Sequence, residues 1–424
     1  MAFKRNLMHF VRNRKEPRII SSSKLSIPET NFNTDLLCDS KNREAIAMNI
    51  KCRKGIGDVD KILQLSTNNS TVDKMERTIE LAKELNKIPN FTFPKVLEYG
   101  NEGKIIKECT KYSTRHDFKQ KTFIELAKSL KLLRMEDLGP IAGDKSYILL
   151  GDVAQLEEAL IQYSIRRLMH NGFKLISVPD VLPTQVIEKC GMIVDGERTL
   201  IYSLDDLYGD DLSLSGTAEM ALATKLINSN IDFENNLPLK LAAVSRCFRA
   251  EISNSAEEQG IYRVHQFTKV EMFACTKECE SDNIFKELTE IQERLFTELE
   301  LPFKIIDMPS HDLGAPAYRK FDIEGWLPGR EAFGELSSCS NCTDYQSRRL
   351  NIKYRTVNGE SKYVHTLNGT ACAIPRTIIA ICENFQTKDG KIQIPEKLVP
   401  FMNGKNVIEK QKIADMRDYK YKCN

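Results

Sequence analysis

This sequence of 424 residues has little net charge and no long apolar run. Its formal net charge is only +2, so any contact with a nucleic acid must come from local basic patches rather than from a globally basic surface. No apolar run approaches the roughly 20 residues that a membrane-spanning helix needs. With 28% charged and 41% hydrophobic residues, the composition is that of a soluble globular chain of two or three domains.

Cysteine is present, but its spacing favours neither a disulfide framework nor a zinc site. The 12 cysteines are scattered, which favours a reducing compartment. Cys339 and Cys342 form a Cys-x-x-Cys pair, but no second pair stands at zinc-ribbon spacing. Cys275 and Cys279 are separated by a different interval. We therefore expect no zinc.

The first two dozen residues differ from the rest of the chain in charge. Seven basic residues stand against a single acid, Glu16, and three serines follow at 21–23. Apolar residues that could form a stripe beside the basic face are Phe3, Leu7, Phe10 and Val11. This composition is typical of a mitochondrial import segment, and the alternative is a basic tail that contacts RNA. We predict a transit segment over residues 1–25 and a location in the mitochondrial matrix.

The next segment has the periodicity of a helical hairpin. Residues 42–65 have a helical pattern that is interrupted at Gly55 and Gly57, and a polar breaker follows at 66–70. Beyond the breaker, apolar residues recur at steps of three and four, at Val72, Met75, Ile79 and Ala82. The second helix must end before Pro89. Two helices joined by a short turn predict an antiparallel pair.

The most informative stretch is 245–273. Apolar and polar residues alternate over 247–251 and again over 264–271, which predicts two strands joined by a long polar loop. Because alternate residues share a face, Arg249 and Glu251 should lie together, with Phe267 and Glu271 facing them. An arginine can grip a phosphate bidentately, and an aromatic ring can offer its face to a purine. The alternative is a hairpin with a salt-bridged exposed face.

Phe-Arg-Ala-Glu, a charged loop and then Arg-Val-His-Gln-Phe-x-Lys-Val-Glu resemble motif 2 of the class II aminoacyl-tRNA synthetases, in its seryl-tRNA synthetase version. The resemblance covers roughly residues 42–402. It implies an α+β fold, with the antiparallel class II sheet flanked by helices. It also implies a tRNA-binding helical arm over 26–115 and a catalytic domain over 116–424. The helix expected at 153–171 and the strand at 173–179 resemble motif 1, which forms the dimer interface in class II enzymes.

The arm departs from the family pattern in its length. Residues 54–60 and 88–94 resemble the two bases of the family's coiled-coil arm. The sequence between them allows helices of about ten and about seventeen residues, and therefore an arm of about 15–25 Å. The usual arm is much longer and embraces the extended variable loop of serine tRNAs. Either the cognate tRNA lacks that loop, as animal mitochondrial serine tRNAs do, or another surface recognises it.

The resemblance also assigns the amino-acid pocket. Residues 214–219 resemble the family's serine-binding loop, with Glu219 meeting the substrate ammonium. On local chemistry alone, Thr217 is a helix cap and Glu219 a first-turn acid that suits the helix dipole. Thr370 falls where the family places a hydroxyl near the serine side chain. The implied serine-binding set is Thr217, Ala218, Glu219, Arg249, Glu271, Asn368 and Thr370.

Residues 365–376 resemble motif 3, whose arginine, here Arg376, lies along the ATP tail. Ala371 and Pro375 stand where the bacterial form has glycines. Glu335 should contact a ribose or, through ATP, a magnesium ion, because carboxylate oxygens suit this ion. The implied catalytic residues are Arg249, Glu251 and Arg376. The implied ATP-binding set is Arg249, Ala250, Glu251, Val264, Phe267, Glu335, Leu336, Ser337, Ser338 and Arg376.

Four residues continue the family pattern without an assigned ligand: Asp344, Gln346, Arg348 and Arg349. They either buttress the site or form a structural network of ion pairs.

The activity that the resemblance implies is a serine–tRNA ligase. It would use ATP to convert L-serine to seryl-adenylate and then transfer the seryl group to the 3′ end of mitochondrial serine tRNA. A homodimer is expected, and a heterodimer with a paralogue is the alternative. A catalytically inactive paralogue that serves as a binding or regulatory subunit is one rival, although that role would not need the full set of Arg249, Glu251, Glu271, Glu335 and Arg376. A ligase for threonine is the other, but no zinc-binding Cys/His set stands near the pocket residues.

Overall fold

The fold is given by a computed structural model, which describes residues 26–410 apart from 68–73, 112–116, 136–137, 144, 195, 197–198, 206, 208, 210, 233–235 and 252–258. The predicted transit segment and most of the charged loop of the hairpin therefore lie outside the described residues.

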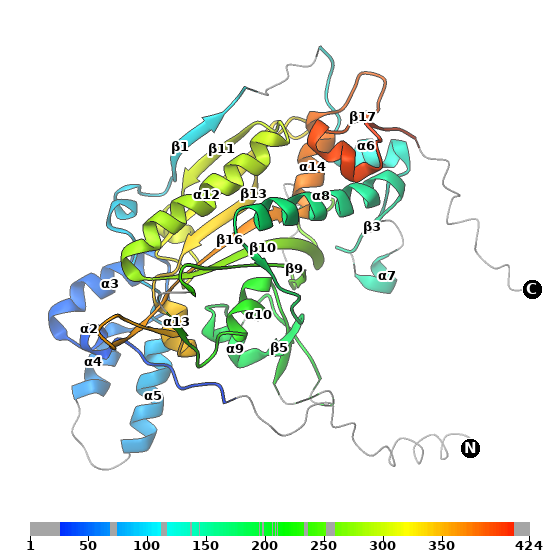
Figure 1. Ribbon diagram of the computed structural model, residues 1–424. Coiled ribbons are helices and arrows are strands. Elements are labelled where there is room, and N and C mark those ends of the chain that lie inside the picture. Colours follow the sequence, from blue (N-terminus) through cyan, green and yellow to red (C-terminus); the bar gives the residue numbers. More distant parts are fainter. Residues whose placement is uncertain are drawn as a thin grey trace, which may run out of the picture.

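An eight-stranded sheet forms the centre of the molecule (Figure 1). Neighbouring strands are antiparallel, except that the last one, β4, runs parallel to β9. This sheet confirms the α+β class. In spatial order its strands are β1 (Lys104–Cys109), β11 (Phe303–Asp307), β12 (Arg319–Leu327), β13 (Ala332–Asn341), β16 (His365–Ala373), β10 (Gln266–Thr276), β9 (Leu239–Phe248) and β4 (Lys174–Leu175).

Three long helices cover one face of this sheet: α8 (Gly151–His170), α12 (Ser281–Glu298) and α14 (Ile374–Asn384). Short helices pack against the other face near β9 and β10: α9 (Thr184–Lys189), α10 (Ala218–Thr224) and α13 (Tyr345–Leu350). In β10, Val270, Met272 and Ala274 belong to the core under the long helices, whereas Phe273 and Cys275 belong to the core beside α10. The strand therefore presents its odd-numbered residues to α10.

The predicted hairpin is confirmed, but its first strand has other bounds. The register pairs Phe248 with Gln266 and Cys247 with Phe267, and β9 ends at Phe248 rather than at Glu251. The N–H of Arg249 still bonds the carbonyl of His265 at 2.9 Å, but the N–H of Ala250 turns to the carbonyl of Leu200. Because that partner lies outside the hairpin, Glu251 is carried into the pocket by a turn and not by strand alternation.

The helical segment near the N-terminus is also confirmed. Its helices are α3 (Arg43–Cys52), α4 (Val59–Thr67) and α5 (Lys74–Asn86), and they share a small core built from Ile46, Ile50, Val59, Ile62, Leu85 and Ile88. With 9 and 13 residues, α4 and α5 are short. Strand β1, which also falls within the predicted arm segment 26–115, joins the large sheet instead. The division into arm and catalytic domain stays a prediction.

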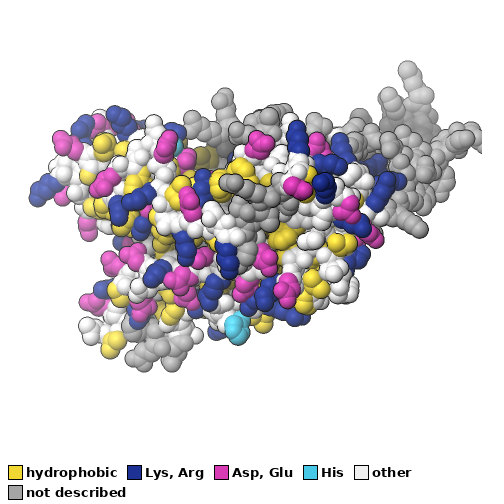
Figure 2. All heavy atoms as spheres, turned by 90° about the horizontal axis from the view of Figure 1, so that it is seen from above, with side chains coloured by type: hydrophobic (Ala, Val, Ile, Leu, Met, Phe, Trp, Pro, Cys, Tyr) yellow, Lys and Arg dark blue, Asp and Glu magenta, His cyan; other side chains and the backbone are white. Residues whose placement is uncertain are grey.

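The remaining described elements are small. Helix α6 (Phe123–Leu130) begins with a capping box at Thr122, and α2 (Thr34–Leu37) precedes α3. The further strands are β2 (Leu133–Arg134), β3 (Ile148–Leu149), β5 (Val181–Pro183), β6 (Tyr202–Ser203), β7 (Leu212–Leu214), β8 (Asn230–Asp232), β14 (Lys353–Arg355), β15 (Ser361–Tyr363), β17 (Ile392–Gln393) and β18 (Val407–Ile408); α7 (Gly139–Ala142) lies between β2 and β3. Within the described ranges, every helix is too short or too polar to span a bilayer. Figure 2 shows acidic and basic side chains interspersed over one face, in keeping with the small net charge.

Candidate functional site

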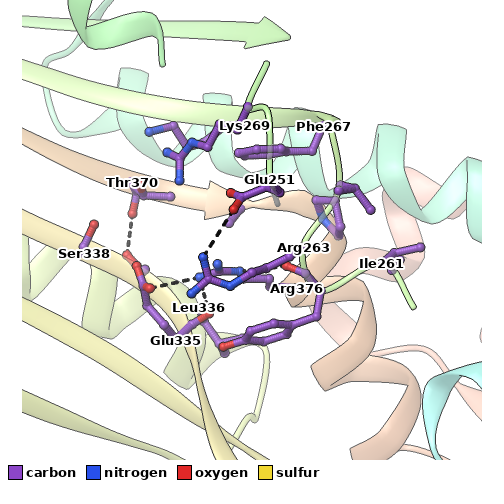
Figure 3. Close-up of a pocket in the computed structure, with 16 residues that line it drawn as sticks. Glu251, Ile261, Arg263, Phe267, Lys269, Glu335, Leu336, Ser338, Thr370 and Arg376 are labelled. Atoms are coloured by element: carbon purple, nitrogen blue, oxygen red, sulfur yellow. Dashed lines mark hydrogen bonds and ion pairs between the residues drawn. The ribbon is translucent and has the colours of Figure 1, made fainter. Parts of the chain in front are cut away.

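A pocket of about 590 Å³ lies where the hairpin β9–β10 meets β13, β16 and the start of α14. Figure 3 shows Phe267 and Lys269 on one side of it, and Glu335 and Arg376 on the other. The predicted residues that line the pocket are Arg249, Glu251, Val264, Phe267, Glu335, Leu336, Ser337, Ser338, Thr370 and Arg376. Segments more than a hundred residues apart in the sequence are thus brought into one cavity.

Arg249 carries a guanidinium with spare donors at this pocket. Its guanidinium carbon lies 5.4 Å from the centre of the Phe267 ring. Its hydrogen bond, from Nη2 to the carbonyl of Gly216, is long at 3.5 Å, and within the described chain its buried Nε has no partner. A buried donor without a partner is costly, so the arrangement favours a ligand that supplies acceptors.

Arg376 reaches the same pocket from the first turn of α14. Its Nη1 lies 3.0 Å from Glu335 Oε2 and also bonds the Glu335 carbonyl at 3.1 Å. Its guanidinium carbon stands 4.5 Å from the Tyr262 ring centre, and its Nε bonds the Tyr262 carbonyl. Burial by itself raises the pKa of Glu335, but the charges of Arg376 and Lys320 outweigh it and lower this pKa. Glu335 therefore stays ionised at the pocket wall.

A second group of predicted residues lies beside this pocket, next to α10. Thr217 caps α10, its Oγ1 accepting from the N–H of Glu219 and donating to Glu271 Oε2 at 3.3 Å. Glu271 is 1% exposed and forms an ion pair with Lys269, which also lines the pocket. The helix cap is thus confirmed, and the serine-binding role of Thr217 stays a prediction.

Glu219 differs from Glu271 in its partners. Its Oε1 accepts from Gln346 Nε2 at 2.5 Å and from Asn368 Nδ2 at 2.9 Å. Both donors are neutral amides. Burial, followed by the nearby charge of Glu271, raises the pKa of Glu219 to about 7. One carboxylate of the pair therefore has its own cation, and the other is held by amides.

Some predicted residues play other parts. Ala250 is absent from the pocket lining, and its N–H donates a hydrogen bond to the carbonyl of Leu200. Ala218 is fully buried at the start of α10. The four unassigned residues divide: Gln346 supports Glu219, whereas Arg348 pairs with Asp344 at 2.6 Å and Arg349 lies over the Tyr345 ring. Gln346 thus contacts a predicted pocket residue, Asp344 and Arg348 form an ion pair, and Arg349 contacts Tyr345.

Among the pocket residues to which the sequence had assigned no role are three polar ones: Tyr262, Arg263 and Lys269. Lys269 lies between Phe267 and Glu271 at the same alternating period, so the strand pattern itself could have identified it. Arg263 lies 3.7 Å from Glu251. Tyr262 and Arg263 stand in the irregular chain before β10, where no periodic pattern indicates which way a side chain points.

The residues present suit a hard cation that is held partly by the ligand's phosphates better than a metal ion that is held by protein ligands alone. Glu335 is ionised and its side chain is 40% exposed. In the described chain, no cluster of three or more His, Cys, Asp and Glu side chains could hold a metal ion. Cys339 and Cys342 are both buried free thiols, and burial raises the pKa of each. Glu335 could therefore share a magnesium ion with phosphates.

Comparison with known proteins first shows the class of protein to which the chain is similar. Residues 202–385 match the family described as the tRNA synthetase class II core domain (G, H, P, S and T), where the letters denote amino acids. This match contains the β9–β10 hairpin, β13, β16 and α14, and therefore the whole pocket.

The relatives narrow the class. The serine–tRNA ligase of Borreliella afzelii is 40% identical over 361 residues, which is 81% of this chain and 84% of that protein. The mitochondrial serine–tRNA ligase of Bos taurus is 41% identical over 319 residues, 74% of this chain. A seryl-tRNA synthetase structure from Pyrococcus horikoshii, complexed with ATP, superposes with a TM-score of 0.77 at 29% identity, covering 90% of this chain and 100% of that one. The chain belongs to the serine–tRNA ligase family. Its match spans 61% of the Bos taurus protein and 62% of the mitochondrial relative from Mus musculus.

Proposed function

We propose that the protein is a serine–tRNA ligase that activates L-serine with ATP and transfers the seryl group to a serine tRNA. The observation that carries this proposal is the shared pocket of Arg249 and Arg376, with Phe267 beside the first arginine and Glu335 beside the second. Two guanidinium groups suit the α-phosphate and the tail of a triphosphate, and the ring suits adenine. The alternative of a salt-bridged hairpin face is not favoured for Arg249, because this residue forms no ion pair within the described chain.

The group of residues beside the pocket supports serine as the substrate. Glu219 has neutral partners among the described residues, so it is the carboxylate that a substrate ammonium would pair with. Glu271 already has Lys269 as its counter-ion and stands next to Thr217. Thr370 lies at the boundary with the ATP pocket, where its hydroxyl would meet the serine side chain. A buried site that bonds a substrate hydroxyl rejects analogues that lack it.

In the proposed reaction, the serine carboxylate attacks the α-phosphorus of ATP, forming seryl-adenylate and releasing pyrophosphate. A ribose hydroxyl at the 3′ end of the tRNA then takes the seryl group, and AMP leaves. The chain contributes position and charge: Arg249 holds the α-phosphate, Arg376 the tail, and Glu219 the ammonium. Glu335 would hold Mg²⁺, which neutralises phosphate charge when bound. No side chain forms a covalent bond to the substrate.

The relatives and the short helices α4 and α5 also support a proposal for the location and the partners. The mitochondrial relatives and the basic N-terminal composition support a mitochondrial matrix enzyme. The shortness of α4 and α5 favours a serine tRNA without an extended variable loop. We infer a homodimer through α8 and β4, where Met169 and Leu175 are 55% and 44% exposed. A paralogue as the second subunit would appear as a different mass in light scattering of the purified complex.

Serine-dependent exchange of pyrophosphate into ATP tests the activation step directly. We expect exchange in the wild type. In Arg249→Ala the exchange rate should fall at least a hundredfold, because losing a charge-assisted contact removes roughly 3 kcal/mol of transition-state stabilisation. Arg294→Ala is the control, since Arg294 lies exposed on α12 and bonds Asn171 at 3.1 Å. Normal exchange in Arg249→Ala would refute the assigned role. A wild type that binds tRNA but shows no exchange would identify the inactive paralogue.

A further inference from the structure

The two oxygens of the Glu219 carboxylate have different environments. Oε1 accepts both amide hydrogen bonds, from Gln346 at 2.5 Å and from Asn368 at 2.9 Å. For Oε2, the described residues provide no hydrogen bond or ion pair, and this atom is not among the buried polar atoms without a partner. Since Glu219 is only partly buried, Oε2 is the oxygen that the described protein leaves without a partner. Such a division is unusual for a carboxylate that merely stabilises a core, where both oxygens find donors.

The orientation of the Gln346 amide is determined by its neighbours. Its Nε2 faces two acceptors, Glu219 Oε1 and the carbonyl of Cys190 at 3.1 Å. Neither the Cys190 carbonyl nor an ionised carboxylate can donate, so the atom between them must be the NH₂ group. On the other side, Oε1 of Gln346 accepts from Thr366 Oγ1 at 2.7 Å. The two N–H groups are thus both used, and Gln346 is fully buried.

This chain of contacts links three parts of the fold. Thr366 lies on β16, Gln346 on α13 and Glu219 on α10, and Gln346 and Glu219 are 127 residues apart in the sequence. Thr366 is itself fully buried. Asn368, two residues beyond it on β16, supplies the second bond to Glu219. One strand therefore holds the carboxylate both directly and through Gln346.

We propose that Gln346, oriented by Thr366, is a positioning residue that holds Oε1 of Glu219 so that Oε2 is presented to the ammonium group of the amino-acid substrate. The proposal rests on the serine-activating function proposed above and deepens it. A neutral donor is essential to the arrangement, because a lysine or arginine at this place would neutralise Glu219 and compete with the substrate cation. An amide fixes the carboxylate without supplying a charge.

The test substitutes the amide by an apolar side chain of similar length. In Gln346→Met, we expect the KM for serine in pyrophosphate exchange to rise roughly tenfold or more, with the KM for ATP unchanged, because one bond to a charged group is lost. The pH at which serine binding is half-maximal should also move upward, since the donor that helps Glu219 to ionise is removed. Thr366→Val, which leaves Gln346 in place, should raise the KM for serine by a smaller factor.

Gln386→Met is the matched control. Gln386 is also buried, and its Nε2 also bonds two acceptors, which here are the backbone carbonyls of Lys121 and Glu383. Its Oε1 also accepts one donor. We expect this variant to lose stability without a change in the KM for serine. Equal KM values for serine in the two methionine variants would overturn the proposal for Gln346. Serine-dependent exchange in the wild type would still support the proposed function, so the two failures can be told apart. If Gln346→Met does not fold, an unchanged serine KM and pH midpoint in Thr366→Val would overturn it instead.

Discussion

At the scale of single residues, the main feature of this site is the unequal treatment of two neighbouring carboxylates. Glu271 is neutralised inside the chain by Lys269, whereas Glu219 is held by amides and its pKa is raised to about 7. Ionised Glu219 is therefore unfavourable in the protein by itself. In the proposed function, the ammonium group of the substrate would offset this cost in stability.

This cost predicts a pH-dependent effect of Glu219→Gln. The pKa of Glu219 is raised on folding, so its protonated carboxyl group contributes to the free energy of unfolding. This contribution is fully present below about pH 4.5 and is lost as the pH rises through about 7. The variant should therefore be more stable than the wild type by about 1–3 kcal/mol at pH 8, and the difference should vanish toward pH 5. Urea unfolding at both pH values measures it.

Glu102→Gln, at an exposed turn, is the control and should show no pH-dependent gain. An equal stability change at pH 5 and pH 8 in Glu219→Gln would contradict the assigned pKa. The same variant should lose serine-dependent exchange, because an amide cannot pair with an ammonium.

At the scale of elements, α3 is tied to the catalytic sheet by one buried arginine. Arg53 follows α3 and is 6% exposed. Its guanidinium donates to the carbonyls of Gly314 at 2.5 Å and of Ala317 at 2.8 Å, in the segment before β12, and to Asn90 and Thr92. Burial lowers its pKa to about 10, so it remains charged at neutral pH. Helix α3 is thereby fixed relative to the segment that leads into β12.

We expect Arg53→Met to destabilise the protein by about 3 kcal/mol, because several buried carbonyls lose their donor. Arg43→Met, at the other end of α3, is the matched control. Arg43 is 48% exposed and pairs with Asp60 at 2.6 Å, so its loss should hardly change the free energy of unfolding. Denaturant unfolding of both variants measures the difference. Similar costs would mean that Arg53 does not tie α3 to the sheet.

At the scale of the whole molecule, amino-acid activation and tRNA contact are expected on separate parts. The pocket lies on the large sheet, whereas α4 and α5 stand at one end of the molecule (Figure 1). Lys74 and Lys83 are exposed on α5. With a net charge of only +2, such local basic residues must provide the phosphate contacts.

The double variant Lys74→Glu/Lys83→Glu should therefore raise the KM for tRNA several-fold and leave serine-dependent pyrophosphate exchange unchanged. Aminoacylation measured at two salt concentrations should show a weaker salt dependence than in the wild type. Lys388→Glu/Lys391→Glu, on the turn beside β17, is the control. If the α5 variant charges tRNA as well as the wild type does, another surface recognises the tRNA.

The sequence by itself determined the local elements and the chemical types of the site residues. The alternation over 264–271 predicted β10, glycines and a polar breaker separated α3, α4 and α5, and the motifs identified Arg249, Glu335 and Arg376. These features depend on neighbours in the chain, where period and turn chemistry act. The end of β9 was predicted wrongly because it depends on a contact with a distant part of the chain. The N–H of Ala250 bonds the carbonyl of Leu200, which no local pattern indicates.

Only the tertiary structure decided which oxygen of Glu219 is held and which one the described residues leave without a partner. It also placed Lys269 against Glu271, and β1 at the edge of the large sheet. These contacts join residues that no period relates, and burial sets the charge of Glu219 only after the fold has excluded water. The physical reason is that hydrogen-bond partners and desolvation are properties of the packed molecule, whereas helix and strand patterns are properties of the chain.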